Sequence, residues 1–315
     1  PEARCGCSGP RGSPGLGDGG QLFESGSVVI NELLANSTGV GPDWIELYNT
    51  TSETIDVGGW HLSDDADDLT KYRITSGTSI APGSYLVLSE DQHFGNPNDP
   101  GCITPFGLSK DGETVYLLSA SDEFLTGYSE RREFDASEVG VSVGRWRMST
   151  GEYDFLALAE PTPGSANAPP AVGPVVISEI MYHPLDDEEL EYVELLNISD
   201  ESVVLYDDAD GHSWRFTDDP DALGIELLFP SDSPVTVVAG AYLVLARNAD
   251  AVRSRYGVSN RVKVIAWGTG HLANGTGTLQ LSRPGAADEE GEFEWIRVDQ
   301  VAYSDGSHPE GFAQG

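Results

Sequence analysis

V-V-I-N-E-L at residues 28–33 is the stretch that decides the fold, because it returns as V-V-I-S-E-I at residues 175–180. D-W-I-E-L-Y-N at 43–49 returns in the same order as E-Y-V-E-L-L-N at 191–197. Similarity between distant parts of one chain, at a nearly constant separation, indicates a duplicated structural unit. The sequence therefore predicts two related domains, and 315 residues are enough to give each its own core.

The repeated blocks are short and rich in β-branched and aromatic residues. Three further pairs are Y-R-I at 72–74 with W-R-F at 214–216, P-G-S-Y-L-V-L at 82–88 with A-G-A-Y-L-V-L at 239–245, and D-G-E-T-V-Y-L-L-S at 111–119 with N-G-T-G-T-L-Q-L-S at 274–282. Glycine, proline, asparagine and aspartate separate the blocks, which is typical of an all-β sandwich. Residues 248–256 are the exception, because Asn248 is suited to cap a helix there and Gly257 to end it.

Composition divides the chain at two places. The first 26 residues (1–26) are a leader rich in glycine and proline, and residues 161–173 form a proline-rich linker that we expect to space the domains. The two domains are then expected at residues 27–160 and 174–315.

The second copy ends earlier than the first. Aligning Phe134 with Tyr303 places Gly315 opposite Trp146, so that one closing strand has no counterpart. A sandwich that lacks a strand exposes an unpaired backbone edge, which binds extended segments. We expect this edge to be filled by a continuation of the same chain, by a neighbouring subunit's residues 21–29, or by another protein.

Charge and hydropathy exclude two classes of partner. The chain has 17 Lys and Arg against 52 Asp and Glu, a net charge of −35, which repels the phosphates that a nucleic-acid-binding protein must neutralise. Its apolar runs, such as Val175-Val176-Ile177, are far shorter than the ~20 residues of a membrane-spanning helix. We therefore expect neither nucleic acid nor membrane insertion, and a weak general attraction for divalent cations.

A series of blocks resembles the lamin-tail domain, an immunoglobulin-like β-sandwich. They are I-N-E-L (30–33), W-I-E-L-Y-N (44–49), G-G-W-H-L-S-D (58–64), Y-R-I (72–74), A-P-G-S-Y-L-V-L (81–88), G-L-S-K-D-G-E-T-V-Y-L (107–117) and P-T-P-G-S-A-N (161–167). The second copy is more divergent but keeps W-R-F, G-A-Y-L-V-L and V-D-Q-V-A-Y. The resemblance is to tandem lamin-tail domains of bacterial secreted and surface proteins, and it implies two immunoglobulin-like sandwiches with a tethering or interaction role and no catalytic residues.

The resemblance implies a bacterial type of protein that acts outside the cell, and together with the incomplete second copy it leads us to expect a non-catalytic structural or adhesive protein that forms a fibre or surface array. Its expected partners are further copies of itself, other surface proteins or polysaccharide, and no cofactor is expected. The six histidines show neither HxH nor HExxH spacing, which disfavours a metal hydrolase, and the six tryptophans form no row suited to a carbohydrate. The alternative is the N-terminal tethering region of a larger secreted hydrolase.

Four glutamates recur in the first two strands of the copies, as Glu32 and Glu46 and as Glu179 and Glu194. Two carboxylates on neighbouring strands are the arrangement of a general acid–base pair, but no nucleophile or histidine recurs beside them. We therefore predict a structural use, either capping of a turn or pairing with the arginines of the Y-R-I and W-R-F blocks.

Asp64, Asp65, Asp67 and Asp68 lie in one loop and offer the hard oxygen ligands that Ca²⁺ prefers. The EF-hand pattern is not met. The loop is therefore predicted either as a weak Ca²⁺ site or as a solvated acidic surface.

Four Asn-x-Ser/Thr sequons are candidate glycosylation sites, at Asn36, Asn49, Asn197 and Asn274, with chance occurrence at turns as the alternative.

The three cysteines leave two possibilities open. Cys5 and Cys7 lie in the leader and Cys102 in a turn-like stretch, so that either one leader cysteine bridges to Cys102 or all three are unpaired.

Overall fold

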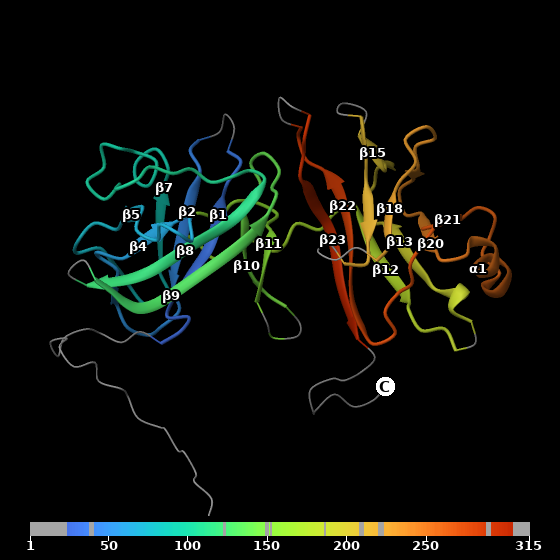
Figure 1. The fold of residues 1–315 in the computed structure, drawn as a ribbon, viewed down its shortest axis with the longest axis horizontal. Helices are drawn as coiled ribbons and strands as arrows, with labels where there is room; N and C mark the ends of the chain where they lie inside the picture. Colours follow the sequence, from blue (N-terminus) through green and yellow to red (C-terminus); the bar gives the residue numbers. More distant parts are fainter. Residues whose placement is uncertain are drawn as a thin grey trace, which may run out of the picture.

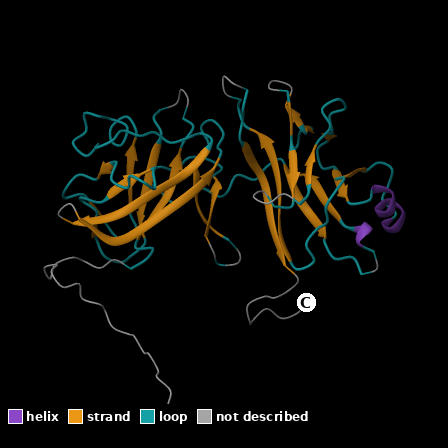
Figure 2. Ribbon diagram, in the orientation of Figure 1, coloured by secondary structure: helices purple, strands orange, loops and turns teal. Residues whose placement is uncertain are grey.

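The computed structural model describes residues 24–37, 41–121, 124–148, 151, 153–185, 187–207, 211–219, 224–287 and 291–304. The predicted all-β fold is confirmed: two immunoglobulin-like sandwiches follow one another along the long axis of the molecule (Figure 1). Strands and loops make up nearly all of the described chain (Figure 2). No helix within it is long and apolar enough to cross a membrane.

The described residues of the first sandwich form eleven strands. They are β1 Val28–Leu34, β2 Trp44–Asn49, β3 Ile55–Asp56, β4 His61–Ser63, β5 Tyr72–Arg73, β6 Ser79–Ile80, β7 Tyr85–Ser89, β8 Gly112–Ser121, β9 Phe124–Asp135, β10 Val143–Arg147 and β11 Tyr153–Ala157. One main sheet has the order β11-β10-β1-β2-β7 and the other the order β5-β4-β8-β9, while β3 and β6 form a small sheet.

The second sandwich repeats this plan with changes at its edges. Its elements are β12 Val175–Met181, η1 Glu188–Leu190, β13 Tyr192–Asn197, β14 Val203–Val204, β15 Tyr206–Asp207, β16 His212–Ser213, β17 Arg215–Thr217, β18 Glu226–Leu228, β19 Thr236–Val237, β20 Tyr242–Ala246, α1 Ala249–Tyr256, β21 Lys263–Ala266, β22 Thr276–Pro284 and β23 Trp295–Ser304. The main sheets have the orders β12-β13-β20-β21 and β18-β17-β22-β23.

Each sandwich has its own hydrophobic core between its main sheets. Val28 and Leu47 from one sheet and Leu117 from the other are 0% exposed in the first core. Leu195 and Leu281 hold the corresponding places in the second, and the two clusters share no residue. Burial of one such side chain contributes roughly 1.5–3 kcal/mol, so the alternating apolar residues of the strands are what hold the sheets together.

The two halves repeat in strand register as well as in sequence. β1 pairs with β2, and β12 with β13, with an irregularity after the third residue of β1 and of β12. Past it, Glu32 lies opposite Glu46, and Glu179 lies opposite Glu194. A bulge at the same place in both halves keeps these glutamates on the outer face of the sheet, opposite the core.

Two correspondences predicted from the sequence are wrong. Leu117 lies opposite Leu62 as Leu281 lies opposite Phe216, so that the blocks 111–119 and 274–282 match only after a shift of one residue.

The W-R-F block matches Y-R-I by eye, but Trp214 takes the structural place of Trp60. The carbonyl of Trp60 accepts from Ile74 N–H (2.8 Å), as the carbonyl of Trp214 accepts from Phe229 N–H (3.0 Å). β4 and β17, which follow the two tryptophans, both lie inside their sheets. The hairpin β15–β16 precedes Trp214 and shifts the spacing that the match relied on.

The predicted helix is confirmed as α1, and local capping explains its length. Asn248 Oδ1 accepts from Ala251 N–H (3.1 Å), and Gly257 ends the helix at φ 65°, a left-handed conformation that favours glycine. Val252 is buried against β20. The helix lies at the far side of the second sandwich from the first (Figure 1).

The two sandwiches differ at one sheet edge. β1 pairs with β2 on one side and with β10 on the other, and β10 pairs in turn with β11. Its counterpart β12 pairs with β13 alone, and the described part of the second half holds no counterpart of β10 or β11. Within the described residues the second sandwich has no closing strand, and β12 is an edge strand on which Ile177 N–H donates to Asp299 Oδ2 of β23 (2.7 Å).

Two arginines of the second sandwich contact the first. Arg297 in β23 donates from Nη2 to Phe155 O (2.9 Å) and lies 3.5 Å from Asp154 and 3.6 Å from Asp135. Arg283 pairs with Glu138. The sheet that contains β23 thus faces the first sandwich, and the sheet that contains β12 faces away from it (Figure 1).

Arg297→Ala is expected to loosen the two sandwiches without unfolding either, because it removes contacts that join them but leaves both cores intact. Small-angle X-ray scattering should show a larger radius of gyration, and calorimetry should show the two unfolding transitions moving apart. Arg255→Ala, on exposed α1, is the control. An unchanged scattering profile for Arg297→Ala would contradict this role.

Candidate functional site

The paired glutamates of the first sandwich are buried although they point away from its core. Glu32 and Glu46 are both 0% exposed. β1 is buried at every residue and β2 at all but one. A strand of an outer sheet is normally buried on one face only, so another part of the chain must cover this one.

Residues 161–167, which we call the turn segment, lie on the two glutamates. Thr162 donates its N–H to Glu32 Oε1 (2.9 Å) and its hydroxyl to Glu32 Oε2 (2.7 Å). Gly164 donates its N–H to Glu46 Oε2 (2.5 Å), and Ser142 donates its hydroxyl to Glu32 Oε1 (2.6 Å). The carboxylates thus cap a turn, which is one of the two structural uses that the sequence predicts.

The local conformation of the turn segment follows from its proline and glycine. Ser165 N–H donates to Thr162 O (3.0 Å), and Gly164 has φ +82°. Proline at the second position and a positive φ at the third define a type II turn, which requires glycine there. This turn presents the N–H groups of its first and third residues to the two glutamates.

Two asparagines hold the end of the turn segment. Asn31, at the bulge of β1, donates from Nδ2 to Glu46 Oε1 (2.8 Å) and to Asn167 Oδ1 (2.6 Å). Asn167 donates in return to Asn31 O (3.1 Å) and to Arg145 O (3.0 Å). The linker that the composition marks as a spacer therefore begins with seven residues bound to the first sandwich.

Burial raises the pKa of Glu46 to about 7. Desolvation is the main cause, and the neighbouring charge of Glu32 adds to it, while the hydrogen bonds from Gly164 and Asn31 act in the opposite direction. At neutral pH the cap therefore holds a carboxyl that is close to the midpoint of its titration.

The second sandwich presents the same pair of glutamates without a cover. Burial alternates along β13, and Glu179 is exposed while Glu194 is half-buried. Glu179 Oε1 accepts from the hydroxyl of Tyr192 (2.6 Å), and Glu194 Oε1 accepts from the hydroxyl of Ser178 (2.8 Å). A carboxylate accepts about four hydrogen bonds, so both retain acceptor capacity. We call the outer surface of β12 and β13, bordered by Tyr242 of β20, the open face. Helix α1 and the loop after it cover the rest of β20, where Val244 and Ala246 are buried.

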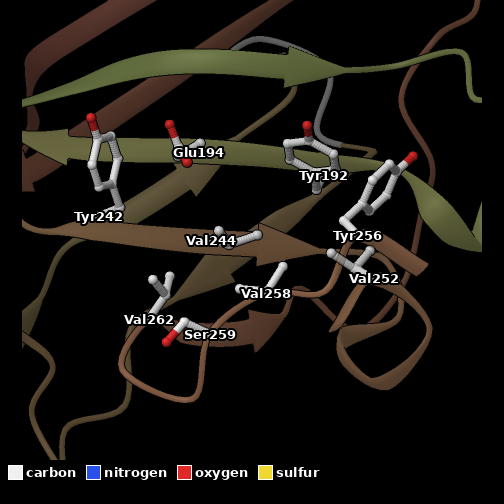
Figure 3. Close-up of a pocket in the computed structure, with 9 residues that line it drawn as sticks. All are labelled: Tyr192, Glu194, Tyr242, Val244, Val252, Tyr256, Val258, Ser259 and Val262. Carbon is white, nitrogen blue, oxygen red and sulfur yellow. The ribbon is translucent and has the colours of Figure 1, made fainter. Parts of the chain in front are cut away.

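A pocket of about 210 Å³ adjoins the open face. Figure 3 shows Tyr242 and Tyr192 on either side of Glu194, with Val244 below them. The complete lining is Tyr192, Glu194, Tyr242, Val244, Val252, Tyr256, Val258, Ser259 and Val262. Tyr242 and Tyr256 are 46% and 40% exposed. An aromatic wall beside a carboxylate suits a ligand that joins an apolar ring to a hydrogen-bond donor.

The aspartates of the predicted Ca²⁺ loop do not converge on one point. Asp64 and Asp65 lie 2.7 and 3.5 Å from Lys71 Nζ. Asp68 accepts hydrogen bonds from within the loop, and Asp67 is exposed. Across the described ranges, no group of three or more His, Cys, Asp or Glu is arranged to hold a metal ion. Ca²⁺ binding at this loop stays a prediction.

Three of the four sequons have a buried amide. Asn49 and Asn197 are 0% exposed, and each donates from Nδ2 to two backbone carbonyls at 2.7 and 2.8 Å. Asn36 is 8% exposed and donates to Ser137 O (2.9 Å). Because a glycan is attached through Nδ2, these three positions do not fit one in the folded protein. Asn274 is exposed.

Expression in a host that attaches N-glycans is therefore expected to modify Asn274 alone. Mass spectrometry of the intact protein should show at most one glycan, and Asn274→Gln should remove it. A glycan found on Asn49 or Asn197 would contradict the burial of their amides.

The predicted pairing of the two arginines with the four glutamates is wrong. Arg215 lies 3.8 Å from Glu226 and 4.3 Å over the ring of Trp295. Arg73 lies beside Gly59 and forms no ion pair within the described residues. The reason is topological: these arginines lie in the sheet opposite that of the glutamates, with the core between them.

Cys102 is half-buried and donates its thiol to Phe94 O (3.4 Å). It forms no disulfide within the described part of the chain, and Cys5 and Cys7 lie outside that part.

Sequence reasoning missed the two parts of the site that depend on distant segments. The turn segment is recognisable in the sequence as P-T-P-G-S-A-N, but nothing local to it indicates that it lies on Glu32 and Glu46. The tyrosines of the pocket come from β13, β20 and α1, and no spacing in the sequence indicates that they meet.

Comparison with known proteins supports the assignment of the first sandwich. A search of curated proteins finds no match for the chain. The family model described as Lamin Tail Domain matches residues 23–131, which include β1 to β8 and part of β9. Over this stretch, and short of β10, β11 and the turn segment, the chain is similar to the Lamin Tail Domain family.

Proposed function

We propose that this protein is a non-catalytic structural or adhesive module that acts outside the cell and assembles with further copies of itself through the open face and the β12 edge. One observation carries the proposal: the glutamate pair that is capped in the first sandwich is uncapped in the second, beside a strand that pairs on one side only. Both features gain hydrogen bonds when another chain docks.

The site disfavours catalysis. Glu32 and Glu46 are the closest approach to a general acid–base pair, but both are fully buried beneath the turn segment, where a substrate has no access. The similarity of residues 23–131 to the Lamin Tail Domain family likewise favours a binding module.

The expected assembly joins unlike surfaces. The open face belongs to the second sandwich, and its counterpart on the first is already covered. A contact between two different patches of the same chain builds open filaments unless the rotation closes a ring. With a net charge of −35, copies repel one another at low salt, so that salt or divalent cations should promote the assembly.

Sedimentation velocity over a range of protein and salt concentrations tests the proposal. We expect species larger than the monomer that grow with both concentrations, and filaments or rings by electron microscopy. A chain that stays monomeric under all these conditions would contradict self-assembly and favour the alternative, a tethering region of a larger secreted hydrolase.

A further inference from the structure

The first sandwich shows what kind of segment fits the open face of the second. Glu32 and Glu46 receive three hydrogen bonds from a Thr-Pro-Gly turn. Glu179 and Glu194 occupy the same register positions behind the same bulge. The acceptors for a second turn of this kind are therefore already in place, and they remain accessible to solvent.

The pocket beside Glu194 suits the proline of such a turn. The pocket lies beside Glu194 and between Tyr192 and Tyr242 (Figure 3). We therefore expect it to receive the second residue of a turn whose third N–H donates to Glu194; the equivalent Pro163 of the first sandwich is exposed. Proline is rigid and apolar, and grooves lined by aromatic side chains bind it at a low entropic cost. The open face thus combines carboxylates for backbone N–H groups with an aromatic surface for the ring.

One other segment of this chain has the sequence of the turn segment. Five Pro-Gly pairs occur in the chain, and in two of them a hydroxyl residue comes first. These two are T-P-G-S-A-N at 162–167 and S-P-G-L-G-D at 13–18, which also share a side-chain amide or carboxyl at the sixth position. Proline followed by glycine has the type II turn signature in both. Residues 13–18 lie outside the described part of the structure.

Charge and position favour the leader of a second copy as the segment that binds the open face. Residues 1–20 carry two acidic and two basic residues, so that they are neutral in a chain of net charge −35. This makes them the stretch that the acidic open face repels least. The leader precedes β1 in the first sandwich, whereas the open face belongs to the sheet of the second sandwich that faces away from the first (Figure 1).

We propose that residues 13–18 of one copy bind the open face of another as a type II turn. The Ser13 N–H and hydroxyl donate to Glu179, the Gly15 N–H donates to Glu194, and Pro14 packs in the pocket. The proposal rests on the self-assembly proposed above and names the segment and the acceptors that it uses.

A fluorescent peptide of residues 8–20, titrated with the full chain, tests the pairing by fluorescence anisotropy. We expect saturable binding that Glu179→Gln/Glu194→Gln weakens about tenfold or more, as expected for the loss of charge-assisted hydrogen bonds. A Gly15→Ala peptide should also bind more weakly, because its third turn position needs a positive φ. Asp200→Asn/Glu201→Gln removes two exposed acids from a turn of the same sandwich and should leave binding unchanged.

A second peptide and the assembly itself separate the possible outcomes. A peptide of residues 160–168 that binds while the leader peptide does not would overturn the choice of the leader, as would assembly that persists in full-length Gly15→Ala. If the chain is monomeric and the full-length Gly15→Ala variant binds the wild-type peptide more tightly than the wild-type chain does, each open face is filled by the leader of its own chain. That result would also overturn the proposal. Assembly of the chain without specific binding of the leader peptide would overturn this proposal alone, whereas failure of the chain to assemble despite specific peptide binding would overturn the proposed function and, with it, the contact between copies. Near-ultraviolet circular dichroism confirms that each variant is folded.

Discussion

Raising the pH from 4.5 to 7 is expected to lower the free energy of unfolding of this protein, with Glu46 as the largest single contributor. The pKa of Glu46 rises from 4.5 to about 7 on burial. In this window the folded state keeps a proton that the unfolded state has released, so that stability falls as pH rises. The contribution is complete below pH 4.5, is lost by about pH 7, and amounts to about 3 kcal/mol.

Other buried carboxyls act in the same direction. Burial also raises the pKa values of Asp43, Glu90, Glu113, Glu130, Glu191 and Asp299, with desolvation as the first cause in each case. Wild-type protein is therefore expected to be more stable in mild acid than at neutral pH, although many acid-sensitive proteins depend on ionised carboxylates and behave in the opposite way.

Urea unfolding at a series of pH values measures this effect. Glu46→Gln should lose about 3 kcal/mol less stability than the wild type between pH 4.5 and 7, because glutamine does not titrate. Parallel pH profiles for the two proteins would refute the assignment to Glu46, whatever the absolute stability of the variant.

Glu32→Ala is expected to destabilise the protein by about 3 kcal/mol, because it leaves the buried hydroxyl of Ser142 and the two half-buried donors of Thr162 without their acceptor. The turn segment should then detach from β1 and β2 and become sensitive to proteases. Chemical denaturation gives the free energy, and limited proteolysis with mass spectrometry gives the site of cleavage.

The chain provides a matched control for this substitution. Glu179 holds the same register position in the second sandwich but is exposed, and Tyr192 is its hydrogen-bond donor. Glu179→Ala should change the free energy of unfolding by less than about 0.5 kcal/mol, as is usual for surface positions. Equal losses for the two variants would mean that the turn segment does not account for the role of Glu32.

Features that depend on neighbouring residues could be predicted from the sequence. The strands at 28–33 and 175–180 follow from their β-branched residues, and α1 follows from the cap at Asn248 and the glycine at Gly257. The repetition of the strand arrangement could also be predicted, because the same pattern of apolar residues in the same order gives the β1–β2 and β12–β13 pairs the same register. Local propensity and alternation carry all of this information.

The contacts that make the candidate site come from residues far apart in the chain, and no local pattern encodes them. Glu32 meets Thr162 across 130 residues of sequence, and the same glutamate pair is buried or exposed according to whether a turn covers it. The predicted pairing of the two arginines with the glutamates was wrong for the same reason: the arginines and the glutamates lie in different sheets, with the core between them. The amide of Asn197 looks like a glycosylation site in sequence, but burial and two carbonyl acceptors give it a structural role. Packing between distant segments determines how deeply each of these side chains is buried and which hydrogen-bond partners it has, and these two properties determine what it can bind.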